Sequence, residues 1–141
     1  MKRMIVNKYG GPENLVLEKC EPPTIKELSV RIKVENVGVN FADTLVIRGR
    51  YQERPRPPFS PGLELSGTII ETGSKVKSFK INDRVVGIAK YGSYCDEIIM
   101  PAENVYKIPD SMDFITAASF PVAYGTAFGA IDWKGKLKKN Q

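Results

Sequence analysis

Histidine is absent from this sequence of 141 residues, and cysteine occurs only twice, as Cys20 and Cys95. Zinc sites are built mainly from sulfur and imidazole ligands, with at least three protein ligands at a catalytic site and four at a structural one. Two cysteines that are far apart and show no paired spacing supply neither set. They also make no disulfide framework, and each lies in an apolar, strand-like stretch where cysteine behaves as a small hydrophobic residue. The residues therefore predict a protein without a metal site.

Long apolar runs are missing as well. No uninterrupted run approaches the ~20 residues that a membrane-spanning helix needs. The apolar stretch that follows residues 1–3 ends at Asn7 and Lys8, so no secretory signal is predicted. With 42% hydrophobic and 26% charged residues, the composition is typical of a soluble globular protein. We expect a cytoplasmic protein of about one domain that does not act at a membrane.

The net charge of +5 is concentrated in two places. Residues 48–56 contain four arginines and one glutamate, and residues 131–141 contain four lysines and one aspartate. Two local patches do not make the broad basic face of a nucleic-acid-binding protein, and no motif of that kind accompanies them. Nucleic acid is therefore not an expected partner. The arginine patch either attracts an anionic substrate or is simply a solvated surface.

Short apolar or alternating runs, separated by turn residues, predict strands over most of the chain. These runs are residues 4–6, 15–17, 28–39, 65–71, 84–89, 94–100 and 105–108. The first two flank Gly10-Gly11-Pro12 and predict a hairpin. In the third, the apolar phase shifts to Val37 and Val39, across Asn36 and Gly38, which indicates a bulge. Short strands spaced by turns favour a mainly β fold, a compact and partly closed barrel.

Helices are predicted in two places only. Asn40 is a suitable N-cap for a short helix over residues 42–47, and Gly49 is placed to end it. Near the C-terminus, Asp113 can cap a helix that runs through residue 118. Pro121 is expected to break or restart this helix before a second one over residues 122–133.

Six segments resemble one family when they are taken together and in order. They are residues 38–43 (GVNFAD), 48–51 (RGRY), 61–67 (PGLELSG), 82–85 (NDRV), 92–97 (GSYCDE) and 121–127 (PVAYGTA). They resemble the medium-chain dehydrogenase/reductase superfamily and, within it, the zinc-free quinone oxidoreductases that include zeta-crystallin. That family combines a GroES-like domain with a Rossmann domain that holds the nicotinamide cofactor. No G-x-G-x-x-G fingerprint occurs in the 141 residues. The resemblance therefore implies a GroES-like catalytic domain over residues 1–120. Residues 121–141 would begin the helical connection to a nucleotide-binding domain that is missing from this sequence.

The resemblance also implies a reaction. In the zinc-dependent alcohol dehydrogenases of the superfamily, a cysteine stands at the position of Asn40 and a histidine at the position of Leu63. Alcohol oxidation benefits from a Lewis acid, whereas a quinone or an enone is already electrophilic through conjugation. The implied activity is NADPH-dependent, zinc-independent reduction of a small quinone or enone. We expect the 141 residues alone to be inactive, because the cofactor's main binding domain is missing from them.

Four residues are the candidates for this chemistry. Tyr51 would polarise the acceptor carbonyl, although its ring would otherwise pack under the proline-rich loop. Asn40 would hydrogen-bond the substrate or the nicotinamide ribose, and it is equally an N-cap. Asp43 would orient Asn40 at the cofactor site or favour the positive helix end. Thr126 would approach the nicotinamide or bond back to a helix carbonyl.

A non-enzymatic reading remains open beside the enzymatic one. The chain could be a truncated GroES-like binding module without catalysis, or an inactive remnant of a reductase. A co-chaperonin would carry a flexible, apolar mobile loop, whereas residues 50–58 are rich in arginine and proline. Residues 120–133 are too apolar to face water on all sides, which predicts self-association through them or a frayed C-terminus.

Overall fold

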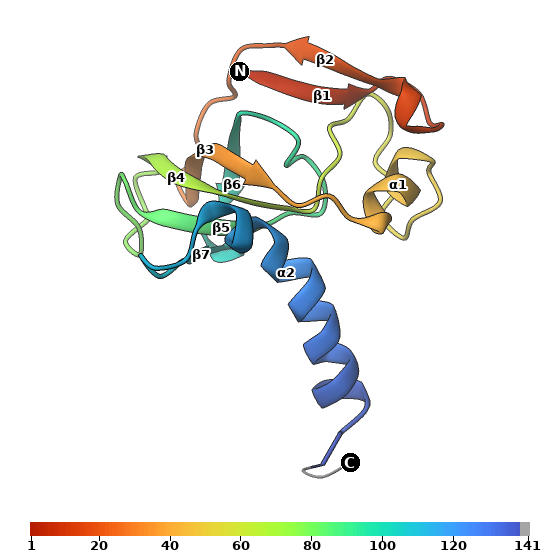
Figure 1. The fold of residues 1–141 in the computed structure, drawn as a ribbon. Helices are drawn as coiled ribbons and strands as arrows, with labels where there is room; N and C mark the ends of the chain where they lie inside the picture. The colour runs from red at the N-terminus through yellow and green to blue at the C-terminus, as the bar shows by residue number, and fades with distance from the viewer. Residues whose placement is uncertain (139–141) are drawn as a thin grey trace.

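Two antiparallel sheets, one short helix and one projecting helix make up the structure, a computed structural model that describes residues 1–138 (Figure 1). The smaller sheet pairs β1 (Lys2–Val6) with β2 (Leu15–Lys19), which is the predicted hairpin. The larger sheet has the strand order β6-β3-β4-β5-β7. Its strands are β3 (Ser29–Val37), β4 (Glu64–Thr72), β5 (Arg84–Ile88), β6 (Glu97–Pro101) and β7 (Val105–Lys107). Strands β6 and β7 are its two edges, so within the described residues the sheet is not closed. The predicted mainly β, GroES-like architecture is confirmed.

The main core lies on one face of the larger sheet. Its fully buried members alternate along the strands, as a half-buried sheet requires. They are Val30, Ile32, Leu65, Ile69, Val85, Met100 and Val105. Leu28, the first residue of the predicted run 28–39, precedes β3 and is 64% exposed. The predicted bulge is present, since the register of β3 against β4 shifts between Val34 and Asn36.

The two α-helices begin at the predicted caps. Helix α1 (Phe41–Ile47) starts at Asn40, and Gly49 follows its end with a φ of 67°, a conformation that glycine adopts without strain. Helix α2 (Phe114–Phe128) starts at Asp113, whose carboxylate accepts from the Thr116 amide at 2.8 Å. The short segments η1 (Pro12–Asn14), η2 (Ala102–Asn104) and η3 (Gly129–Lys134) complete the chain, the last being π-helical.

The expected break at Pro121 was wrong, because α2 runs continuously through it. Proline lacks an amide hydrogen, so one bond of the helix ladder is missing there. The next amide, that of Val122, donates to the Glu64 carboxylate at 2.8 Å. A hydrogen bond from outside the helix therefore supports the backbone directly beside the proline.

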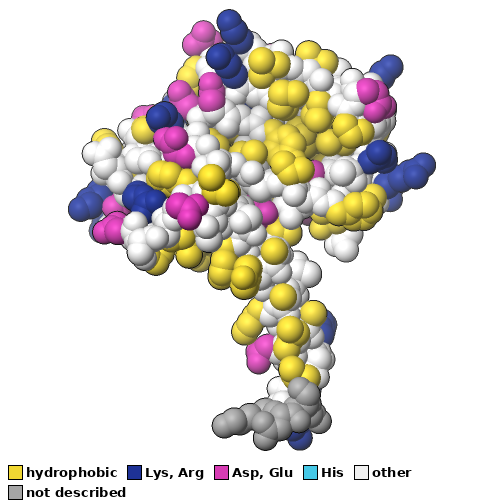
Figure 2. Space-filling view, viewed as in Figure 1, with side chains coloured by type: hydrophobic (Ala, Val, Ile, Leu, Met, Phe, Trp, Pro, Cys, Tyr) yellow, Lys and Arg dark blue, Asp and Glu magenta, His cyan; other side chains and the backbone are white. Residues whose placement is uncertain are grey.

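Helix α2 is fastened to the sheet at its start and then leaves it. The Ser66 hydroxyl donates to the Phe114 carbonyl at 2.6 Å, and the Arg84 guanidinium lies 4.5 Å from the centre of the Phe114 ring. Beyond its first turns the helix projects from the body, and hydrophobic side chains cover much of it (Figure 2). Residues 114–134 are long enough to cross a membrane, and an 18-residue window within them has a mean hydropathy of 1.4, a test that core helices of soluble proteins also pass.

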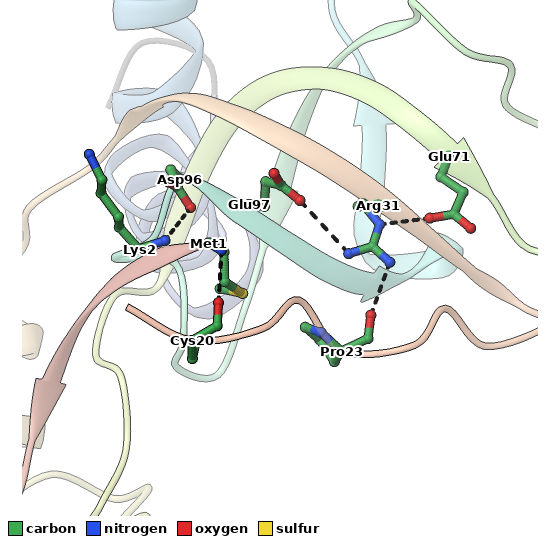
Figure 3. Close-up of polar contacts among 8 residues, drawn as sticks. All are labelled: Met1, Lys2, Cys20, Pro23, Arg31, Glu71, Asp96 and Glu97. Atoms are coloured by element: carbon green, nitrogen blue, oxygen red, sulfur yellow. Dashed lines mark hydrogen bonds and ion pairs between the residues drawn. The ribbon is translucent and has the colours of Figure 1, made fainter. Parts of the chain in front are cut away.

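The N-terminal hairpin is held by contacts with distant parts of the chain. The Val6 amide donates to the Phe59 carbonyl at 2.8 Å, and the Met4 amide to the Tyr94 carbonyl at 2.8 Å. The N-terminal amine of Met1 donates to the Cys20 carbonyl at 2.8 Å (Figure 3).

The side chain of Arg31 is largely buried, and its polar contacts, drawn in Figure 3, fix the segment between β2 and β3. Its guanidinium contacts Glu71 at 2.7 Å and Glu97 at 3.8 Å, and it also donates to the Pro23 carbonyl at 2.9 Å. An arginine with several planar donors suits this task, since it can reach two carboxylates and a carbonyl at once. The contacts join β4, β6 and the incoming segment across β3.

Candidate active site at the start of helix α1

Two of the four candidate residues meet at the first turn of α1. Asn40 is the N-cap residue, and it forms a capping box with Asp43 at the third helical position. The Asn40 backbone amide donates to the Asp43 carboxylate at 2.7 Å. This pairing satisfies an amide that would otherwise lack a partner at a helix start. The structural role predicted for both residues is therefore present, and their role toward a cofactor stays a prediction.

Asp43 is unusually buried for a carboxylate, with 1% of its surface exposed. Burial raises its pKa, hydrogen bonds from the Asn40 amide and the Tyr94 hydroxyl lower it, and the charge of Glu64 raises it further; the net shift is upward. Asp43 Oδ1 and the hydroxyl of Ser93 are buried without a hydrogen-bond partner among the described residues. Burying a carboxylate with so few hydrogen-bond donors lowers the free energy of unfolding, so this polar group does not contribute to the stability of the fold.

Tyr94 donates to the same Asp43 oxygen as the Asn40 amide does. Its hydroxyl donates to Asp43 Oδ2 at 3.1 Å. Burial raises the pKa of Tyr94, and the Asp43 charge raises it further, so the phenol holds its proton. The tyrosine ring packs beside Gly62, whose φ of 103° is suited to glycine and whose added side chain would overlap the Ser93 hydroxyl.

Glu64, the first residue of β4, joins Asn40 to helix α2. It is 2% exposed, and its Oε1 accepts from Asn40 Nδ2 at 2.8 Å while its Oε2 accepts from the Val122 amide. Neither Glu64 nor Tyr94 was singled out as a site residue from the sequence. Their one signal in the sequence is their position within the family segments 61–67 and 92–97.

The structure does not bring Tyr51 into this network. Tyr51 is half-buried in the loop that follows α1, where its side chain packs against a second apolar cluster. That cluster consists of Val6, Val46, Ile47 and Phe59. Within residues 1–138 the Tyr51 hydroxyl has no hydrogen-bond partner, so it remains free to bind a ligand. The packed ring and the free hydroxyl are compatible, and the catalytic role stays a prediction.

Thr126 is exposed on α2, one helical turn beyond Val122. Among the described residues no hydrogen bond joins it to Asn40 or Asp43, and the Glu64 carboxylate links Asn40 to its helix at Val122. A cavity of about 550 Å³ is lined by Phe59, Tyr91 and Cys95 among others, and none of the four candidates lines it.

Cys95 and Leu63 are not placed as metal ligands in the part of the chain that the structure describes. Burial raises the pKa of Cys95 to about 12, with a further contribution from Asp96, and its thiol donates to the Gly92 carbonyl. Leu63 is buried with 8% of its surface exposed. Among residues 1–138 no group of three or more aspartate, glutamate or cysteine side chains is placed to hold a metal ion.

Residues 26–110 match the family model of the alcohol dehydrogenase GroES-like domain. The chain belongs to this family. Quinone oxidoreductase-like protein 2 of Rattus norvegicus is 38% identical over 127 residues, 90% of this chain. The crystal structure of the human synaptic vesicle membrane protein VAT-1 homolog-like protein superposes with a TM-score of 0.94 at 33% identity, covering 99% of this chain and 45% of that one. The Escherichia coli quinone oxidoreductase complexed with NADPH gives a TM-score of 0.84 at 29% identity, over 93% and 40% of the two chains.

These relatives confirm the resemblance to the quinone oxidoreductases of the medium-chain dehydrogenase/reductase superfamily. The chain spans 36% of the length of the rat relative, so it corresponds to the GroES-like part of such a protein.

Proposed function

We propose that the chain is the substrate-side domain of an NADPH-dependent, zinc-independent reductase of quinones or enones. The relatives support the oxidoreductase family, and two similar solved structures carry NADPH. The 141 residues contain no glycine-rich phosphate fingerprint, so they would meet only the nicotinamide end of the cofactor. Asn40, Asp43 and Thr126 remain the proposed residues for that contact.

The observation that supports the proposal most directly is that the Asn40 side chain is hydrogen-bonded to Glu64 at the start of α1. At the position where zinc-dependent members have a cysteine ligand, this chain has a neutral amide held by Glu64 and by the start of α1. An amide suits a carbonyl or hydroxyl oxygen better than a zinc ion, which prefers thiolate, imidazole or carboxylate. The donor set therefore fits a reaction in which oxygen is hydrogen-bonded rather than bound to metal.

Bound NADPH would supply the hydride, and the residues of this chain would serve the acceptor. When hydride adds to a quinone or to the β-carbon of an enone, negative charge develops on the carbonyl oxygen. A donor that already points at this oxygen stabilises the charge without reorganisation. Asn40 Nδ2 and the free hydroxyl of Tyr51 are the two donors proposed for it.

The test is a fusion of the 141 residues to the nucleotide-binding half of a quinone oxidoreductase relative. NADPH consumption is followed with an ortho-quinone and with an α,β-unsaturated ketone, and a saturated alcohol with NADP⁺ serves as the control reaction. Turnover of either acceptor that falls in Asn40→Ala and persists with a chelator supports the proposal. A folded, NADPH-binding fusion without turnover of any acceptor would favour the non-catalytic binding module.

A further inference from the structure

The Glu64 carboxylate lies between the candidate site and helix α2, and each of its oxygens has a different partner. Oε1 accepts from Asn40 Nδ2 and Oε2 from the Val122 amide, both at 2.8 Å. Glu64 is 2% exposed, and among the described residues it forms no ion pair. A buried carboxylate without a cation is retained against a large desolvation cost, which points to a use for its hydrogen bonds.

The bond to Asn40 determines which way that amide faces. The Asn40 side chain donates through its nitrogen and the Glu64 carboxylate oxygen accepts, so the amide is held with its nitrogen toward Glu64. The amide oxygen is thereby directed to the amides at the start of α1, where Asn40 forms the capping box. The nitrogen has a second hydrogen, and this is the donor left for a ligand. With a neutral partner that both donates and accepts, either orientation of the amide would be possible.

The bond to Val122 acts on the helix that carries Thr126. Pro121 lacks an amide hydrogen, so one bond of the helix ladder is missing immediately before Val122. A charge-assisted hydrogen bond to a backbone amide at such a point fixes the rotation and register of the following turn. Thr126 lies on that following turn.

Gly38 shows that the position of the carboxylate is enforced by packing. A Cβ at Gly38 would overlap the Glu64 carboxylate, and the Gly38 amide donates to the Glu64 carbonyl at 3.3 Å. Only a glycine leaves room for the glutamate side chain to reach Asn40 along this path. The end of β3 and the start of β4 are thus shaped around this one side chain.

We infer that Glu64 is a positioning residue. It holds the Asn40 side chain so that its nitrogen is the hydrogen-bond donor offered to a ligand, and it fixes the orientation of the turn of α2 that follows Val122. The identity of the ligand that Asn40 would bind depends on the proposed function, whereas the hydrogen bonds of Glu64 with Asn40 and Val122 do not. The inference therefore has a structural arm, on the 141-residue chain, and a kinetic arm, on the fusion.

In the structural arm, Glu64→Gln is compared with Glu71→Gln, a matched change at the far end of the same strand. Loss of the charge-assisted bond should speed hydrogen exchange of the Val122 amide about tenfold and shift the NMR signals of the Asn40 side-chain amide. Glu71→Gln should leave both unchanged. If both signals in Glu64→Gln match the wild-type chain, the inference is wrong.

The wild-type chain provides a measurement that does not depend on the variant folding. Val122 and one Asn40 side-chain amide proton should exchange more slowly than in an unfolded chain, and exchange at the unfolded rate would overturn the inference. In the kinetic arm, Glu64→Gln should lower kcat about tenfold or more with a smaller change in KM for NADPH. If the wild-type fusion is inactive while the exchange and NMR results are as expected, the proposed function alone is rejected. If kcat of Glu64→Gln equals that of the wild-type fusion, the positioning of Asn40 by Glu64 is rejected.

Discussion

The hydroxyl of Tyr94 donates a hydrogen bond to the Asp43 carboxylate at 3.1 Å, across 51 positions of sequence. It joins the segment before β6 to the first turn of α1, next to the N-cap Asn40. The Asp43 oxygen that receives it also accepts from the Asn40 amide, while the other oxygen has no partner among the described residues. The candidate site is therefore held by a small number of buried hydrogen bonds, and each of them should be measurable.

Replacing Tyr94 with phenylalanine should lower stability measurably. The change removes one donor from a buried carboxylate and leaves the ring in place, a loss of about 1–3 kcal/mol. Urea unfolding followed by circular dichroism gives this quantity. Tyr106→Phe, at an exposed position on β7, is the matched control and should change stability by less than about 0.5 kcal/mol. Equal unfolding midpoints for Tyr94→Phe and the wild-type chain would show that the bond contributes nothing.

The raised pKa of Asp43 predicts a pH dependence with a definite sign. Below its ordinary pKa, Asp43 is protonated in both the folded and the unfolded state. Above that value the unfolded state loses the proton first, so the free energy of unfolding falls as pH rises to the raised pKa of the folded state. Asp43→Asn removes this cost, so its stability relative to the wild-type chain should improve from about pH 4 upward.

Urea unfolding of both proteins between about pH 4 and pH 7 measures this difference. Asp83 and Asp113 have lowered pKa values and act in the opposite direction, but they are present in both proteins and cancel in the comparison. A difference that stays constant with pH, or that favours the wild-type chain at higher pH, would contradict the burial of Asp43 as an ionised group.

Local patterns were sufficient to predict most of the fold. The alternation around Val30 and Ile32, the cap at Asn40 and the cap at Asp113 each depend on neighbours within a few residues, and each is present. The break expected at Pro121 is absent, because the Glu64 hydrogen bond that supports the helix there comes from 58 positions away. Periodicity and capping rules contain no information on such a partner.

The candidate site was predictable only in part, for the same reason. Asn40 and Asp43 are three positions apart on one helical turn, so their association follows from sequence. The contacts of Glu64 with Asn40 and of Tyr94 with Asp43 depend on how β3, β4 and α1 pack in three dimensions. Side-chain type and spacing alone do not indicate either contact.

The purified chain should bind no zinc. It has no histidine, a buried Leu63 and an Asn40 whose nitrogen is engaged by Glu64. Elemental analysis after dialysis against zinc, and then against buffer, should give far less than one equivalent per chain. One equivalent that withstands the second dialysis would contradict the prediction and the zinc-independent reaction proposed with it.

The free hydroxyl of Tyr51 gives a kinetic prediction. In the fusion described above, Tyr51→Phe should lower kcat by roughly tenfold or more while NADPH binding changes little, because the ring keeps its packing and only the donor is lost. The 141 residues alone should show no turnover, since positioning of the cofactor can account for ~7–11 kcal/mol of the barrier. Equal rates for the tyrosine and phenylalanine forms would make Tyr51 a packing residue. Turnover by the 141 residues above that of buffer would contradict the second expectation.

The exposed face of helix α2 should cause the chain to self-associate. Phe120 and Tyr124 stack at 4.4 Å on its surface, and farther along Phe128 and Trp133 are 67% and 75% exposed. An apolar surface of this kind is unusual on a soluble monomer and tends to become covered by a partner. In a solution of the pure chain, the partner available is a second copy.

Light scattering should therefore give an apparent mass that rises with protein concentration. Hydrogen exchange of residues 120–133 should become slower over the same range of concentration. The double variant Phe128→Ser with Trp133→Ser should remain monomeric at the same concentrations. Tyr106→Ser, which removes an exposed aromatic side chain from β7, is the control and should associate like the wild-type chain. A strict monomer at high concentration, with residues 120–133 fully protected from exchange, would show that α2 folds back and buries its own apolar face.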